Sequence, residues 1–263
     1  MRKYLDYMAI GIKEDLAYPS SIWAAFFSKV VYLYMQFCLW SALFASNTSS
    51  ALPMQKDGVI RYIIVATIIS SFIECDATVW INEQIHSGNI AVQLIRPINF
   101  CGMIFSRHVG KCAIRFLTCC IPLTLATVFF FRMPLVCRQQ IFFALASLAL
   151  AYAIQFLYSL IIGLMAFWLI VTWPLNMLLG AFYKLLSGSW IPCAMFPDFL
   201  KTLNSFLPFR AMYEIPVTML TNPMDDRELI LKLGVQAVWL LLLYGLVKVV
   251  WEVGIKKLVV QGG

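Results

Sequence analysis

Residues 141–183 read IFFALASLALAYAIQFLYSLIIGLMAFWLIVTWPLNMLLGAFY, without one Asp, Glu, Lys or Arg. A helix needs about 20 predominantly apolar residues to cross the hydrocarbon core of a bilayer. This stretch is therefore long enough for two crossings, which we place at 141–163 and 164–183. Only Gly163 marks a join between them, so the pattern predicts either a very tight turn there or two staggered helices.

The composition extends this interpretation to the whole chain. Hydrophobic residues make up 62% of the sequence and charged residues 13%, whereas an ordinary soluble domain has about 25% charged residues. In a soluble protein so much apolar surface would leave large exposed patches. We therefore expect an all-α polytopic membrane protein, with residues 1–263 in a single transmembrane domain. The six predicted membrane spans are 22–46, 59–81, 113–131, 141–163, 164–183 and 230–253.

Residues 1–20 precede the first span and have the pattern of an amphipathic helix. They are too polar to be a secretory signal peptide. The apolar positions at helical spacing are Leu5, Met8, Ala9, Ile12 and Leu16, and the charged positions on the other side are Arg2, Lys3, Asp6 and Lys13. This pattern predicts an interfacial helix, whose apolar face lies on lipid headgroups or against another helix.

Both chain ends are short and basic, and an even number of spans returns them to one side of the membrane. The loops hold nearly balanced numbers of Lys and Arg, so the ends decide the orientation, and we expect both termini in the cytoplasm. The net charge of +7 is then explained by contact with lipid headgroups, and we expect no nucleic-acid partner.

The sequence carries none of the familiar signatures of catalysis or of metal binding. Its eight cysteines form no Cys-x-x-Cys pair, and its two histidines, His86 and His108, are far apart in the chain. Phosphate-binding loops, nucleophile elbows and zinc-protease motifs are absent. We expect a chain that is not an enzyme, with no metal and no bound cofactor.

Ionisable residues within or beside membrane spans are functional candidates, because each is costly unless it is paired or reaches the interface. The candidates are Lys29, Glu74, Asp76 and Arg115. We expect Lys29 to reach the inner interface with its flexible stem, and Glu74 and Asp76 to pair with Arg115. An ordered relay of acids, as in a proton-coupled carrier, is not apparent.

Residues 184–229 combine five prolines with apolar clusters. This favours short helices on the outer side, either at the interface or re-entering the membrane, and the alternative is an ordinary amphipathic outer loop. The residues that mark this outer hairpin are Trp190, Pro192, Phe199, Phe206, Pro208, Arg210, Tyr213 and Pro216.

Three motifs in this order resemble the permease subunits of type-2 ATP-binding-cassette (ABC) exporters, in the viologen-exporter-like branch. They are SGNIAVQLIRPIN at 87–99, SGSWIPCAMFPDFLKTLNSFLPFRAMYEIP at 187–216, and VVQGG at 259–263. The resemblance implies an interfacial N-terminal helix, six spans, a cytoplasmic coupling region at 82–111 that rests on an ATPase, and re-entrant outer helices at 184–229. It also implies a location in the bacterial cytoplasmic (inner) membrane.

Under this resemblance, the segment 84–97, QIHSGNIAVQLIRP, is the ATPase-coupling element. Four roles are expected of its residues: forming a tight turn, making apolar contact with the ATPase, pairing a charge with an acidic rim of the ATPase, and ending the element. In that order they are Ser87, Gly88 and Asn89; Ile90, Val92, Leu94 and Ile95; Arg96; and Pro97. The alternative is a plain loop between two helices.

The resemblance also implies partners and a function. The partners are a nucleotide-binding ATPase subunit, which would hold the ATP and Mg²⁺, a second identical or homologous permease chain, and membrane lipids. The function would be ATP-driven export of an amphipathic drug, peptide or lipid-like substrate. The alternatives are a membrane scaffold or immunity protein that does not pump, and a secondary carrier.

Overall fold

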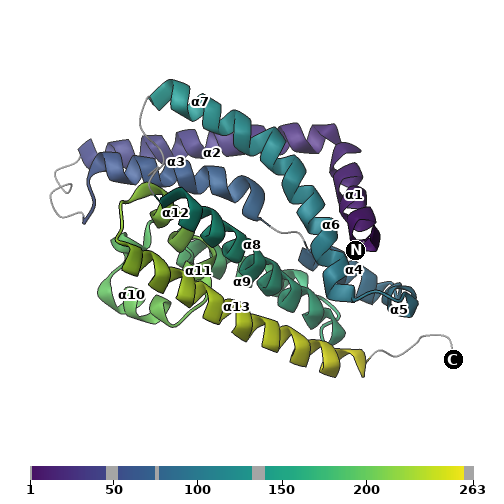
Figure 1. Cartoon of the computed structure of the whole chain (residues 1–263). Coiled ribbons are helices and arrows are strands. Elements are labelled where there is room, and N and C mark those ends of the chain that lie inside the picture. The colour runs from purple at the N-terminus through teal and green to yellow at the C-terminus, as the bar shows by residue number, and fades with distance from the viewer. Residues whose placement is uncertain (1, 46–52, 75–76, 132–139, 258–263) are drawn as a thin grey trace.

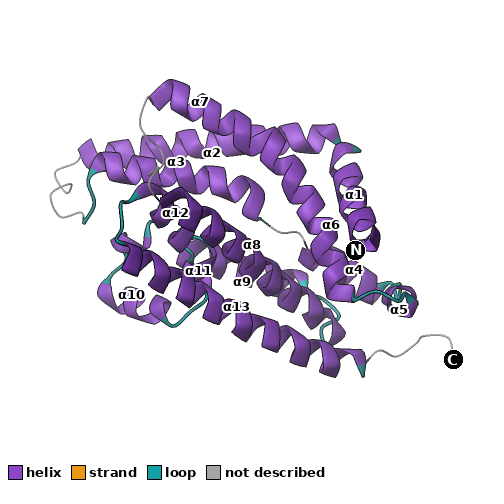
Figure 2. Cartoon of the chain, viewed as in Figure 1, coloured by secondary structure: helices purple, strands orange, loops and turns teal. Residues whose placement is uncertain are grey.

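The computed structural model describes residues 2–45, 53–74, 77–131 and 140–257, and these contain helices and loops but no strand (Figure 2). Five helical segments are long and apolar enough to cross a membrane. The expected all-α polytopic membrane fold is therefore confirmed. The five segments are Pro19–Ala45, Lys56–His86, Phe100–Phe130, Ile141–Phe167 and Asp226–Ile255.

The first helix, α1 (Arg2–Leu16), turns at residues 17–18 into α2 (Pro19–Ala45). The second long segment consists of α3 (Lys56–Ile73) and α4 (Ala77–His86), and the short α5 (Ile90–Ile95) follows. Figure 1 places α1, α4, α5 and the end of α13 together at one end of the molecule, and α10 towards the other.

The third long segment begins earlier than the sequence pattern predicted. Helix α6 (Phe100–Arg115) continues through one π-helical turn (Phe116–Cys120) into α7 (Ile121–Phe131). The helix therefore extends beyond the span predicted at 113–131, because the polar residues before residue 113 pack against α1 and continue the helix. The π-helical turn has a local cause: Pro122 has no N–H to give to residue 118 and its ring crowds that carbonyl, so the helix widens just before it.

The join between the fourth and fifth spans that was predicted at Gly163 was wrong. Helix α8 (Ile141–Leu164) runs through Gly163 and adds one 3₁₀ turn (Met165–Phe167). A Cβ on Gly163 would lie 3.0 Å from Cβ of Ile81 in α4, so this glycine serves close helix packing, not a turn.

The chain is not helical at residues 168–172, and then forms α9 (Trp173–Leu186), which has 14 residues. Its length of about 21 Å is shorter than a bilayer core of about 30 Å. The crossing predicted at 164–183 is thus not among the five long segments.

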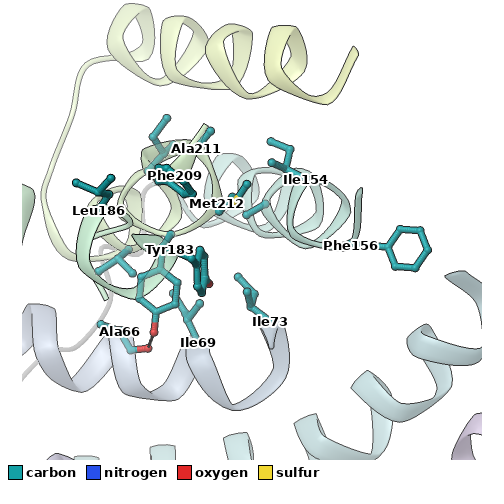
Figure 3. Close-up of a cluster of buried hydrophobic side chains, with 14 of the residues drawn as sticks. Ala66, Ile69, Ile73, Ile154, Phe156, Tyr183, Leu186, Phe209, Ala211 and Met212 are labelled. Carbon is teal, nitrogen blue, oxygen red and sulfur yellow. Dashed lines mark hydrogen bonds between the residues drawn. The ribbon is translucent and has the colours of Figure 1, made fainter. Parts of the chain in front are cut away.

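The hydrophobic core is built on α3 and α8, which are largely buried, whereas α2 and the final helix α13 (Asp226–Ile255) are largely exposed. Figure 3 shows the centre of this core: the cluster comprises Ala66, Ile69 and Ile73 of α3, Ile154 of α8, Tyr183 and Leu186 of α9, and Phe209, Ala211 and Met212, while Phe156 points away from it. The last three of the cluster belong to α11 (Phe209–Met212).

The segment before α13 forms short helices, as predicted. After a turn at Gly188, whose φ is +85°, come a 3₁₀ turn (Cys193–Met195), α10 (Asp198–Ser205), α11 and α12 (Glu214–Thr221). Helices α11 and α12 are buried against α3 and α8, while α10 lies at the surface. Gln236 of α13 is fully buried and donates to the carbonyl oxygens of Ala211 (2.8 Å) and Ser147 (3.1 Å).

Candidate functional site

The segment between α4 and α6 has the turn chemistry that its sequence predicts. Gly88 has a φ of +72°, a conformation that a glycine adopts without strain, and it joins α4 to α5. Helix α5 ends before Arg96, which is extended ahead of Pro97. The side chain of Asn99 then accepts a hydrogen bond from the N–H of Gly102 at 2.9 Å and caps α6. The chain therefore presents α5 as a short helix between two fixed turns (Figure 1).

The apolar residues of α5 divide into two groups. Ile90 is fully buried and Leu94 packs against the core, so these two hold the helix on the protein. Val92 is 55% exposed and Ile95 is 83% exposed. Of the four apolar residues predicted to offer contact, these last two are exposed, Leu94 is partly buried and Ile90 is buried.

Arg96 binds within the chain. Its Nη1 donates to the hydroxyl of Tyr7 in α1 at 2.7 Å, beside a hollow of about 240 Å³ that Trp80 and Arg107 also line. Its role toward an acidic rim of a partner stays a prediction. The hydrogen bond to Tyr7 shows that α5 is tied to the N-terminal helix, a link that the sequence pattern did not suggest.

Helix α1 is in turn clamped to α6 by ion pairs. Arg107 reaches Glu14 with Nη2 at 2.6 Å and with Nε at 2.9 Å, and its guanidinium lies 4.6 Å from the centre of the Trp80 ring. Lys111 lies 3.4 Å from the same carboxylate. Because this arginine binds the carboxylate through two N–H groups and also stacks on an aromatic ring, it fixes the relative orientation of α1 and α6 in addition to pairing the charges. This clamp gives no signal in the sequence, because Glu14 and Arg107 are 93 positions apart.

The N-terminal helix thus packs against α6, but only with part of its predicted apolar face. It turns Gly11 to α6, while Leu5 and Leu16 of the predicted apolar face stay exposed. This leaves an apolar stripe free for a lipid surface on a helix that is already held by the protein.

Aromatic stacking connects the same region to the last helix. The Trp80 and Phe100 rings are stacked with centroids 6.2 Å apart, and Phe100 stacks on Trp251 of α13 at 4.7 Å. Trp251 also meets Phe167 edge to face at 6.2 Å. The helices on both sides of α5 are therefore joined to the end of α13.

The predicted intramembrane charges meet, but not as expected. Lys29 donates to the Glu74 carboxylate at 2.9 Å and to Oγ of Ser70 at 3.0 Å, so its amine is paired within the protein. Arg115 forms an ion pair with Asp15 at 3.3 Å and donates to the backbone carbonyl of Glu74 at 3.3 Å. The expected pairing of the Glu74 carboxylate with Arg115 was therefore wrong, because Lys29 holds that carboxylate. Asp76 lies outside the described residues.

Two cavities are lined in common by this ion pair. The larger, of about 720 Å³, is lined by residues of both signs from α1, α2, the end of α3 and α6. The smaller, of about 380 Å³, extends between α2, α3 and α9 to Ser189 and Trp190. Ala25, Lys29 and Glu74 line both cavities.

The predicted outer-hairpin residues separate into a surface group and a buried group. Trp190, Phe199 and Phe206 are exposed. The buried group is Pro192, Pro216 and Tyr213, whose hydroxyl donates to the carbonyl of Ala66, while Pro208 precedes α11 and Arg210 pairs with Glu214.

Within the part of the chain that the structure describes, no group of three or more His, Cys, Asp or Glu side chains could hold a metal ion. His108 is buried in α6, with its ring 6.2 Å from that of Phe156.

Comparison with known proteins supplies one finding. Residues 30–262 match the family model described as ABC-2 family transporter protein. The search of curated proteins gave no match.

Proposed function

The chain belongs to the ABC-2 family of transporter proteins, and from this premise we propose that it is the membrane subunit of an ATP-driven exporter. Membership makes it a multi-pass permease subunit of an ABC transporter, with an ATPase subunit as partner. The proposal adds that the substrate is an amphipathic drug, peptide or lipid-like molecule, that it moves outward, and that ATP and Mg²⁺ bind on the ATPase.

The exposed apolar surface of α5 carries this proposal. Val92 and Ile95 stand out from a six-residue helix that Ile90 anchors from below. Ile95 is a large apolar side chain that is exposed between polar turns. Its burial under a partner would make the free energy of binding more favourable. We assign this surface to the ATPase.

The contacts around α5 suit a segment that transmits motion. Arg96 ties α5 to Tyr7 of α1, and Glu14 ties α1 to Arg107 of α6. A displacement of α5 would therefore move α1 and α6 together, as a packed unit that is not easily deformed. The second permease chain, identical or homologous, would complete the substrate path.

The experiment compares Ile95→Asp with Ile95→Leu, co-expressed with the ATPase at matched membrane levels. The charge should reduce co-purification of the ATPase by about tenfold or more, because a carboxylate would be buried in an apolar contact. The conservative Leu should retain binding, and substrate efflux should follow binding in both variants. Full ATPase binding and efflux with Ile95→Asp would contradict the coupling role and support a non-pumping scaffold or a secondary carrier.

A further inference from the structure

The ion pair of Lys29 with Glu74 lines both cavities. Ala25, Lys29 and Glu74 line both, so the cavities are two lobes on either side of the contact between Lys29 and Glu74. The larger lobe reaches α1 and α6, and the smaller reaches α9 and Trp190. Together they extend along α2 and the end of α3, which both line the two lobes.

The ion pair at this meeting point is open to a ligand. The side chain of Lys29 is 20% exposed and that of Glu74 is 45% exposed. An ion pair that is in contact with water contributes little to stability, because solvent screens it. Lys29 and Glu74 can therefore each bind a charged group of a ligand in place of the other with little loss of free energy.

The charges of the larger lobe favour a ligand with both signs. Arg107 and Lys111 are paired with Glu14, and Arg115 is paired with Asp15. Glu83 of α4 adds an exposed carboxylate to this lobe. The pair of Lys29 with Glu74 lines both lobes, and it is the pair that we expect a ligand to divide. A simple anion on Lys29 would leave the Glu74 carboxylate without its cation. A zwitterion replaces both partners at once.

The smaller lobe contains a second, independent sign of a ligand. Tyr183 of α9 lines this lobe and is 7% exposed, and its hydroxyl has no hydrogen-bond partner among the described residues. Buried hydroxyl groups are normally bonded, and an unbonded one is unfavourable. The rings of Tyr32 and Trp190 line the same lobe, and such rings attract ammonium groups.

We propose that Lys29, Glu74 and Tyr183 form a binding site for the zwitterionic headgroup of an amphiphile. The anionic group of the ligand binds Lys29, its ammonium group binds Glu74, and a ligand oxygen accepts the hydrogen bond of Tyr183. The apolar tail leaves past Ile22 of α2, next to the exposed Trp23. The assignment of this ligand as the transported substrate rests on the proposed export of an amphipathic molecule. The binding site itself does not depend on the ATPase.

The first test is binding of short-chain phosphatidylethanolamine to the full chain in maltoside detergent, measured by calorimetry. Lys29→Gln and Glu74→Gln should each weaken binding by about tenfold, since each removes a charged hydrogen bond. Exchange of the two charges, Lys29→Glu with Glu74→Lys, should restore most of the affinity because the ligand can bind in the reverse direction. Lys201→Gln, which breaks the exposed ion pair with Asp198, is the matched control and should change nothing.

Tyr183→Phe separates ligand binding from structure. The substitution removes only a hydroxyl that bonds no described residue, so the unfolding temperature should not fall, while affinity should drop by about threefold to tenfold. Unchanged affinity in both Tyr183→Phe and Lys29→Gln would overturn the proposal. Equally tight binding of short-chain phosphatidylglycerol, which is anionic only, would also overturn it.

A membrane phospholipid and a transported amphiphile share this headgroup chemistry, and a second experiment distinguishes them. Vesicles containing the permease and its ATPase are supplied with ATP and a fluorescent phosphatidylethanolamine. ATP-dependent transfer that Lys29→Gln abolishes supports the substrate role, and binding without transfer contradicts that role while supporting a site for a resident lipid. Ile95→Asp should leave binding intact, so failure of the coupling role and failure of this site give different results.

Discussion

Gly11 of α1 and Gly110 of α6 bring their two helices into backbone contact. A Cβ on Gly11 would lie 2.0 Å from the carbonyl oxygen of Arg107, and a Cβ on Gly110 would lie 2.1 Å from that of Met8. Each glycine therefore makes room for the backbone of the other helix, and the ion pairs of Glu14 form beside this crossing.

We predict that Gly110→Ala forces α1 away from α6. The added methyl group would meet backbone, which cannot rotate aside, so the free energy of unfolding should fall by about 1–3 kcal/mol. The measurement is thermal unfolding of the purified chain in detergent.

The control for this variant is Gly245→Ala in α13, because a Cβ there meets nothing within 4 Å. It should be neutral or slightly stabilising, since alanine is favoured over glycine in helices by about 1 kcal/mol. If both variants unfold at the parental temperature, the close crossing of α1 and α6 is wrong.

The second prediction concerns Arg96 and its partner Tyr7. Arg96→Glu should leave membrane insertion unchanged, because the residue lies outside the long apolar segments, and should weaken ATPase co-purification by about tenfold or more. Tyr7→Phe removes only the acceptor of the internal hydrogen bond, so it should weaken co-purification by no more than about threefold.

These two variants distinguish direct contact from support through α1. Lys13→Glu, a charge reversal at an exposed position of α1, controls for net charge and should have no effect. An equal loss with Tyr7→Phe and Arg96→Glu would mean that Arg96 acts by holding α1 and that it does not contact the ATPase.

The third prediction concerns Gln236, which ties α13 to α8 and α11. Gln236→Leu removes both of its bonds to buried carbonyl oxygens, and it should lower the free energy of unfolding by about 1–3 kcal/mol. Val235→Leu, at the half-exposed neighbouring position, should change stability little. Thermal unfolding in detergent would measure both, and a stable Gln236→Leu variant would show that apolar packing alone fixes α13.

The sequence predicted the long apolar helices well, because hydrocarbon imposes a length on any helix that crosses it. It failed where one residue type serves two purposes. Gly163 suits either a turn or a close contact, and only the position of Ile81 opposite it decides between them. Likewise, Arg107 and Lys111 resemble solvated loop residues until Glu14 is seen beside them.

For the candidate site, local chemistry was predictable and pairing was not. Gly88 and Pro97 control backbone dihedrals within a few residues, so the turn and the end of α5 follow from the sequence. The partner of Glu74 depends on how α2 and α3 pack, and Lys29 is 45 positions away. The hydroxyl of Tyr183, which bonds no described residue, gives no signal in the sequence, since only its burial makes it unusual.

The last prediction concerns topology. Asn89 beside α5 and Asp198 at the start of α10 are both exposed, and Figure 1 places these helices towards opposite ends of the molecule. In a variant without the native cysteines, Asn89→Cys should resist a membrane-impermeant thiol reagent in intact cells, and Asp198→Cys should react with it. Gly262→Cys should be protected like Asn89→Cys, because both termini are expected in the cytoplasm. After the cells are permeabilised, all three cysteines should react, which controls for their reactivity. Labelling of Asn89→Cys from outside intact cells would place α5 on the side of the membrane away from the ATPase and would contradict its coupling role.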